Sequence, residues 1–135
     1  MIDVVALGEL LIDFATVGTD VDGYPTMAAH PGGAPANFLS ALTKFGASTA
    51  LIGKVGNDTF GKLLLNTLKN TGIEPRGMVV TDDVFTTLAF VTFDDHGDRD
   101  FAFARKPGAD TCLNFEEIDL SLIDGPRSSI SERSP

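Results

Sequence analysis

The sequence predicts an α/β protein in which a parallel sheet is flanked by helices and carries a smaller antiparallel sheet. Three observations predict this fold class. Short apolar runs that suit buried strands alternate with segments whose apolar residues recur at helical spacing. The resulting strand–helix–strand–helix order implies a parallel sheet covered by helices. Later in the chain, two segments of alternating polarity flank a polar tip, which is typical of a β-hairpin.

The first strand is expected at Val4–Leu7, a short apolar run that ends at Gly8. Leu10 and Ile12 then alternate in position with Glu9, Leu11 and Asp13, which places the carboxylates of Glu9 and Asp13 on one face of an extended chain. Residues 16–30 are rich in Gly, Asp and Thr, so we expect an irregular excursion there that includes one short strand.

The first helix is expected over residues 35–45, where the apolar residues follow helical spacing: Phe38, Leu39, Leu42 and Phe45. Pro35 suits a first helical position, because its missing N–H would have no partner there. Gly46 suits the C-terminal cap, and residues 49–52 form the next buried strand.

The second helix is expected to begin at Asp58 or Thr59, either of which can cap its N-terminus, and to stop near Gly72. It is followed by the hairpin, with strands at 86–93 and 100–104. An antiparallel hairpin attached to a parallel sheet often covers a binding site.

The composition excludes several classes of protein. The chain has 135 residues, 43% of them hydrophobic, and a net charge of −9. This length suits one domain with a modest core, and the acidic charge argues against nucleic acid or an anionic membrane as a partner. Cys112 is the only cysteine, which suits a reducing compartment. Since no leader or membrane-spanning apolar run is visible, we expect a cytoplasmic location.

The stretch PGGAPAN at residues 31–37 places a double-glycine turn directly before a helix. Glycines let backbone N–H groups approach a ligand closely, and a helix N-terminus favours hydroxyl or anionic ligands. Asn37 can donate and accept hydrogen bonds to hydroxyls, or it can cap the helix locally. Asp13 can accept two hydrogen bonds from a sugar diol, or it is simply solvated at a strand end. Taken alone, the turn also fits a tight connection.

Three blocks together resemble the ribokinase or PfkB family of sugar kinases: GELLID at residues 8–13, PGGAPAN at 31–37 and GKVGNDTFG at 53–61. The resemblance extends from Val4 to Asp124, and within the family the sequence is most similar to those of the fructokinases. Leu39 departs from the family pattern, which usually has a small residue at this position. That departure concerns helix packing more than ligand contact.

The resemblance implies that the chain is the N-terminal portion, residues 1–124, of a ribokinase-like parallel sheet flanked by helices. Segments of about 14–30 and 86–105 would form a small β-sheet lid that closes over the sugar. The resemblance also implies six substrate-binding residues, with Asp13 as the principal ligand of the sugar hydroxyls: Asp13, Gly32, Gly33, Asn37, Lys54 and Arg105. For two of these residues a role without substrate is also open. Lys54 would then simply lie at the end of a strand, and Arg105 would be a solvated surface residue.

The full-length family phosphorylates a sugar hydroxyl with ATP and Mg²⁺, and fructose is the expected sugar here. The nucleotide, metal and catalytic-base elements lie in the C-terminal half of the family and are absent from this chain. We therefore expect sugar binding and a lid from this chain, and no kinase activity from the chain alone.

Two alternatives stay open. The chain is also consistent with a non-catalytic sugar-binding or dimerisation module, because lid sheets of this family can pair between subunits as a homodimer. It is also consistent with part of a kinase for another sugar, a sugar acid or a nucleoside. Glu9 with Asp13 is a poor fit for a glycosidase pair, since the two lie too close in one strand. No zinc-ligand spacing, phosphate loop or dinucleotide fingerprint occurs.

Residues 125–135 are an atypical tail, polar and without periodicity, where the family resemblance predicts another buried strand. One set of codons for residues 128–135, read from the third nucleotide, encodes an apolar strand interrupted by glycine. We therefore hypothesise a frameshift near Gly125. Sequencing the gene through this region tests the hypothesis, and codons that differ at two or more of these positions would refute it.

Overall fold

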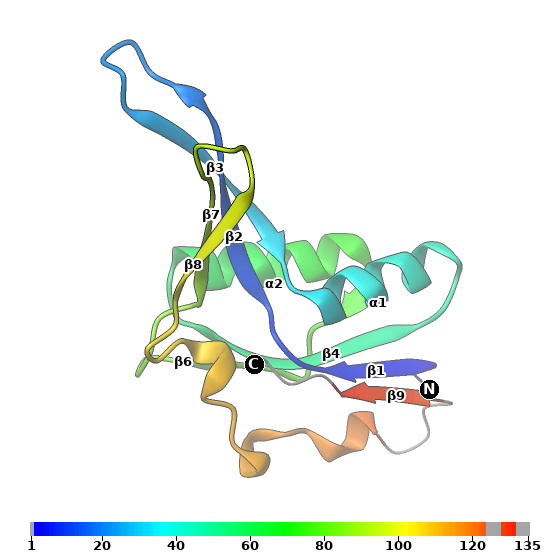
Figure 1. Ribbon diagram of the computed structural model, residues 1–135. Helices are drawn as coiled ribbons and strands as arrows, with labels where there is room; N and C mark the ends of the chain where they lie inside the picture. Colours follow the sequence, from blue (N-terminus) through cyan, green and yellow to red (C-terminus); the bar gives the residue numbers. More distant parts are fainter. Residues whose placement is uncertain (1, 124–127, 132–135) are drawn as a thin grey trace.

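The computed structural model describes residues 2–123 and 128–131, which form two sheets (Figure 1). The main sheet is parallel, with the order β5-β4-β1-β9 and with β6 paired to β4. Its strands are β1 (Val4–Leu7), β4 (Thr49–Gly56), β5 (Ile73–Glu74), β6 (Met78–Thr81) and β9 (Ser128–Ser131). The α/β class predicted from the sequence is confirmed.

The second sheet projects away from the main sheet, and we call it the projecting sheet (Figure 1). Its strand order is β3-β2-β7-β8. Its strands are β2 (Leu11–Thr19), β3 (Pro25–Gly32), β7 (Leu88–Phe93) and β8 (Arg99–Ala104). The predicted hairpin is therefore β7 and β8, and a parallel pairing of β2 with β7 joins it to residues close after β1.

Two helices, α1 (Ala34–Lys44) and α2 (Thr59–Thr71), cover one face of the main sheet (Figure 1). Both begin and end close to the predicted positions. Asp58 caps α2, and Gly72 follows it with a left-handed φ of 89° that suits glycine. The core between helices and sheet contains aliphatic side chains from both helices and from β1 and β4, among them Ala6, Leu39, Leu51, Val55, Leu64 and Leu68.

The opposite face of the main sheet is covered by three short 3₁₀ helices (Figure 1). They are η1 (Ala109–Thr111), η2 (Phe115–Glu117) and η3 (Leu120–Leu122). Leu122 of η3 is buried against Val5, Ala50 and Ile52 and forms a second, smaller core. No helix in the described part of the chain is long and apolar enough to cross a membrane.

Residues 16–30 form most of an antiparallel hairpin, so the prediction of an irregular excursion is wrong. The outer half of β2 and much of β3 are exposed, so their side chains lack the apolar alternation that marks a strand packed on a core. Backbone pairing and the turn hold this hairpin instead. Asp20 Oδ1 accepts the N–H groups of Asp22 and Tyr24 at 2.9 Å each.

The polar tail, whose sequence shows no periodicity, contains one short strand. The backbone of Ser128–Ser131 forms β9, which pairs in parallel with β1. Gly125 and its neighbours, on which the frameshift hypothesis depends, lie outside the described residues.

Candidate functional site

Asp13 lies at the base of the projecting sheet, near the start of β2. It is paired with His30 on β3 and with Ala89 on β7, and Ala89 is paired with Phe103 on β8. Paired residues on neighbouring strands point to the same face of a sheet. We call these four residues the Asp13 row. The adjacent Phe14 points to the other face, where its ring contacts Phe60 of α2 at a centroid distance of 5.4 Å.

The double glycine lies directly against the two carboxylate residues near the start of β2. A Cβ atom on Gly32 would lie 2.2 Å from Oδ2 of Asp13. Gly33 has a φ of 122°, and a Cβ atom there would lie 2.6 Å from the backbone oxygen of Glu9. Gly33 is also the N-cap of α1, with no side-chain cap. The glycines therefore allow the Asp13 carboxylate and the first turn of α1 to lie side by side.

The Asp13 carboxyl lies in an environment that disfavours its charged form. Burial raises the pKa of Asp13 above its ordinary value of 3.8, and the negative charge of Glu9 raises it further. His30, its neighbour in the Asp13 row, opposes both effects. Ligand hydroxyls that donate hydrogen bonds to such a carboxylate stabilise its charged form.

Arg105, which follows β8, is held by two carboxylates. Its Nη2 donates to Oε2 of Glu9 at 3.1 Å and to Oδ2 of Asp110 at 2.7 Å. Its guanidinium carbon lies 4.6 Å from the centre of the Phe103 ring, a cation–π distance. Because Glu9 interacts with both Asp13 and Arg105, the structure brings the predicted residues Asp13, Gly32, Gly33 and Arg105 into one neighbourhood.

The other two predicted residues lie elsewhere. Asn37 is exposed in the first turn of α1, and with Gly32 it lines a small cavity of about 90 Å³ between the helices. Lys54 is buried, and its Nζ donates to Glu117 Oε1 at 2.7 Å and to the backbone oxygen of Cys112 at 3.0 Å. These contacts join η1 and η2 to β4. Sugar binding by Asn37 and Lys54 stays a prediction.

Sequence reasoning missed Glu9 and Asp110 as members of this neighbourhood. Glu9 was placed on the same face as Asp13, but its partner Arg105 lies 96 residues away along the chain. Asp110 lies only five residues after Arg105, but it belongs to no helical or strand pattern in the sequence that would have indicated its role. The pairing of these carboxylates with Arg105 can be recognised only once the fold brings the three side chains together.

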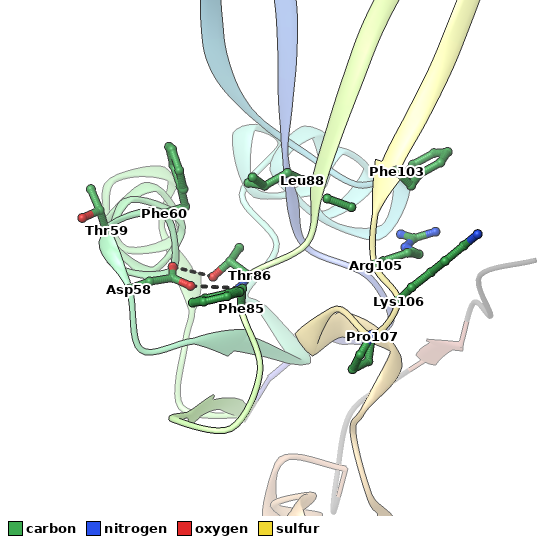
Figure 2. Close-up of a pocket in the computed structure, with 11 residues that line it drawn as sticks. Asp58, Thr59, Phe60, Phe85, Thr86, Leu88, Phe103, Arg105, Lys106 and Pro107 are labelled. Atoms are coloured by element: carbon green, nitrogen blue, oxygen red, sulfur yellow. Dashed lines mark hydrogen bonds between the residues drawn. The ribbon is translucent and has the colours of Figure 1, made fainter.

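A separate hollow of about 520 Å³ lies at the base of the projecting sheet (Figure 2). Phe60, Phe85, Leu88 and Pro107 contribute to a largely apolar lining, and of the six predicted site residues only Arg105 reaches it. Figure 2 shows Leu88 and Phe60 on one side of β7 and β8, and Phe103 and Arg105 directed to the other. The hollow therefore lies mainly on the face opposite to Asp13.

The polar groups of this hollow are mostly engaged within the protein. Asp58 accepts the N–H and the hydroxyl of Thr86 at 2.9 and 2.8 Å, and it accepts the N–H of Gly61 at 2.7 Å. Sugar hydroxyls need polar partners when they leave water. The Asp13 side, where a carboxylate lies beside the N-terminus of α1, fits a polyhydroxy ligand better than the aromatic hollow does.

Among residues 2–123 and 128–131, no group of three His, Cys, Asp or Glu side chains could hold a metal ion.

Comparison with known proteins gives a family match over the whole chain. A family model described as pfkB family carbohydrate kinase matches residues 1–135. Probable fructokinase-6, chloroplastic, of Arabidopsis thaliana is 44% identical over 122 residues, which are 89% of this chain and 32% of that protein. The chain spans about a third of the length of the curated relatives it matches.

Solved structures share the fold. A fructokinase from Xylella fastidiosa is 30% identical, with a TM-score of 0.90 over 97% of this chain and 41% of that chain. A putative Ribokinase II from E. coli, in complex with ATP and Mg²⁺, is also 30% identical. Its TM-score is 0.86, over 97% of this chain and 42% of that chain.

Proposed function

The chain belongs to the pfkB family of carbohydrate kinases, and from this membership we propose that it is the sugar-binding part of a kinase that phosphorylates a sugar hydroxyl. Fructose is the proposed sugar, because the curated relatives at about 40% identity are named fructokinases. The observation that supports a site in this chain is the contact of the Asp13 carboxylate with Gly32 at the N-terminus of α1.

In the proposed complex, the sugar lies on the Asp13 side of the projecting sheet. The Asp13 carboxylate accepts hydrogen bonds from two neighbouring hydroxyls, and the backbone around Gly32 and Gly33 approaches the sugar closely. Arg105, linked to Asp13 through Glu9, donates from the edge of the sheet. The projecting sheet acts as a lid that excludes water from the transferable phosphoryl group.

ATP would supply the phosphoryl group, and Mg²⁺ would neutralise charge on the phosphates. Both are proposed from the family and from the ATP- and Mg²⁺-bound E. coli relative. We propose that the role of this chain is to bind and orient the sugar and to exclude water, and that the chain alone does not transfer phosphate.

Asp13→Asn is expected to weaken fructose binding by about 10- to 100-fold, because a neutral amide replaces the charged acceptor of two hydrogen bonds. Isothermal titration of the 135-residue chain with fructose measures the affinity. Asp100→Asn is the matched control, since Asp100 lies on the exposed β8 and pairs with Thr92 on the other face. A wild-type chain that binds no fructose contradicts the proposed function. Equal affinities for wild type and Asp13→Asn contradict only the role of Asp13.

The same titration has an expected pH dependence. The ionised carboxylate is the form that accepts hydrogen bonds, and the pKa of Asp13 is raised by burial and by Glu9. Affinity is therefore full above the raised pKa and falls as the pH falls through it, beginning at a higher pH than for an ordinary Asp. Asp13→Asn should lack this step, whereas Asp100→Asn should retain it.

A second candidate is a dimerisation module that uses the projecting sheet. Phe93, Phe101 and Phe103 lie on one face of β7 and β8 and are each about half exposed, at 57%, 48% and 47%. Burial of this face against a second copy would remove the exposed aromatic surface from water. Sedimentation analysis separates the two candidates: a dimer that Phe101→Ser dissociates, without fructose binding in either state, would favour the module.

A further inference from the structure

We propose that Asp110 is a positioning residue of the sugar site, whose buried carboxylate holds the Arg105 guanidinium beside the Asp13 row. This inference rests on the proposed function. It adds a residue that does not contact the sugar but determines where a sugar-binding donor lies.

The Asp110 side chain is fully buried, at 0% exposed, and both of its oxygens are used. Oδ2 accepts Nη2 of Arg105 at 2.7 Å. Oδ1 accepts the hydroxyl of Thr87, which is also fully buried. A buried carboxylate is stable only with such partners, and here they fix its position from two directions.

The backbone around Asp110 is built for this contact. A Cβ atom on Gly108 would lie 2.1 Å from Oγ1 of Thr87, so only glycine lets the chain pass close enough for Asp110 to reach that hydroxyl. The N–H of Ala109 donates to the backbone oxygen of Phe85 at 2.9 Å, which holds η1 against the entry of β7. Asp110 is therefore held to the base of the projecting sheet rather than to a mobile loop.

Arg105 retains a donor for a ligand. Its Nε is buried and has no hydrogen-bond partner in the described part of the chain. Buried N–H groups are nearly always paired, so an orphan beside a candidate site points to a ligand oxygen as its acceptor. The guanidinium also lies over Phe103, a member of the Asp13 row, which places this donor near the sugar.

Glu9 cannot perform the same task alone. It contacts Nη2 at 3.1 Å, and its side chain is 21% exposed, whereas that of Asp110 is fully buried and only 2.7 Å away. Without Asp110, the guanidinium would keep one longer contact and could swing toward solvent. The two carboxylates thus differ in role, with Asp110 fixing the arginine and Glu9 linking it to Asp13.

The Nε–Hε cross-peak of Arg105 in ¹⁵N-labelled 135-residue chain tests this assignment. In the wild type we expect a sharp peak with slow solvent exchange, since the group is buried. Asp110→Asn should speed this exchange by about tenfold or more, because a charge-assisted contact is lost. Asp119→Asn, which alters an exposed carboxylate 3.5 Å from Arg76, is the control and should leave the peak unchanged. An unchanged peak in Asp110→Asn overturns the proposal.

Glu9→Gln decides the question if Asp110→Asn does not fold. With Asp110 intact, the Arg105 peak should persist in Glu9→Gln, and its loss would assign the positioning to Glu9 and overturn the proposal. Fructose should shift the peak in the wild type and bind about tenfold or more weakly to Asp110→Asn. Affinity equal to wild type in folded Asp110→Asn overturns it. If the wild type binds no fructose, the proposed function fails, while the exchange rates still decide whether Asp110 positions Arg105.

Discussion

Replacing Gly33 by alanine is expected to lower the free energy of unfolding by about 4 kcal/mol, which combines a strained backbone with an overpacked contact. Gly33 has a φ of 122° and a ψ of 127°, a conformation that residues with a Cβ atom rarely adopt. The new Cβ atom would also lie 2.6 Å from the backbone oxygen of Glu9, which cannot rotate away as a side chain could. Urea denaturation followed by circular dichroism measures the effect.

Gly46→Ala is the matched control for the backbone term. Gly46 also has a positive φ, of 94°, but a Cβ atom there would meet nothing within 4 Å. It should therefore cost about 1–2 kcal/mol, the strain of the backbone alone. Equal unfolding midpoints for the two variants would show that the contact with Glu9 is not the dominant cost. Because the clash moves the first turn of α1, Gly33→Ala should also weaken any sugar binding.

Asp58→Ala is expected to lower the free energy of unfolding by about 3 kcal/mol, since it removes an N-cap and leaves a buried hydroxyl without its acceptor. Asp58 caps α2 through the N–H of Gly61, and it also binds both the N–H and the hydroxyl of Thr86. Thr86 is only 2% exposed, so water cannot replace the lost partner. The substitution therefore removes the side-chain hydrogen bonds that join the N-terminus of α2 to Thr86, just before β7.

The pH dependence of this effect has a defined sign. Burial alone raises the pKa of Asp58, but the hydrogen bonds from Thr86, Gly61 and Phe60 outweigh it, and the pKa is lowered from 3.8. The stabilisation is therefore fully present above the unfolded value and is lost as the pH falls through the lower folded pKa. Wild type and Asp58→Ala should become more alike in stability over that acidic range. A difference that stays constant there would contradict the assigned hydrogen bonds.

Asp119→Ala is the control for capping by itself. Asp119 caps the short η3 through the N–H of Ser121 at 3.1 Å, and it lies at the surface. Its loss should change stability much less than the loss of Asp58. A comparable loss in the two variants would mean that the contacts to Thr86 contribute little.

The fold class and the positions of both helices were predictable because they depend on local chemistry. Caps, glycine stops and helical spacing lie within a few residues of one another, as Asp58 and Gly72 illustrate. The strands β1, β4, β7 and β8 were located for the same reason, although β4 extends to Gly56 and β7 begins at Leu88 rather than at Thr86. The two threonines that precede β7 are buried by hydrogen bonds to carboxylates, which alternation alone does not distinguish from a strand.

The hairpin at residues 16–30 was not predictable from polarity. Its strands have few buried side chains, so the backbone pairing of β2 with β3 decides their conformation. Side-chain polarity does not show which backbone segments pair, and the distant β7 pairs with β2 only over residues 12–15. The short strands β5 and β6 were missed for a related reason, since their partner in both cases is β4.

Three features could be predicted from residue spacing over short stretches of chain: the α/β class, the two helices with their caps, and the residues around the double glycine that carry the family resemblance. The partners of the charged side chains, in contrast, depend on the assembled fold. It placed Lys54 on Glu117, 63 residues away, and Arg105 between Glu9 and Asp110. A buried charge takes its position from whichever opposite charge the packed elements bring near it, and that choice is made only when the sheets and helices are assembled.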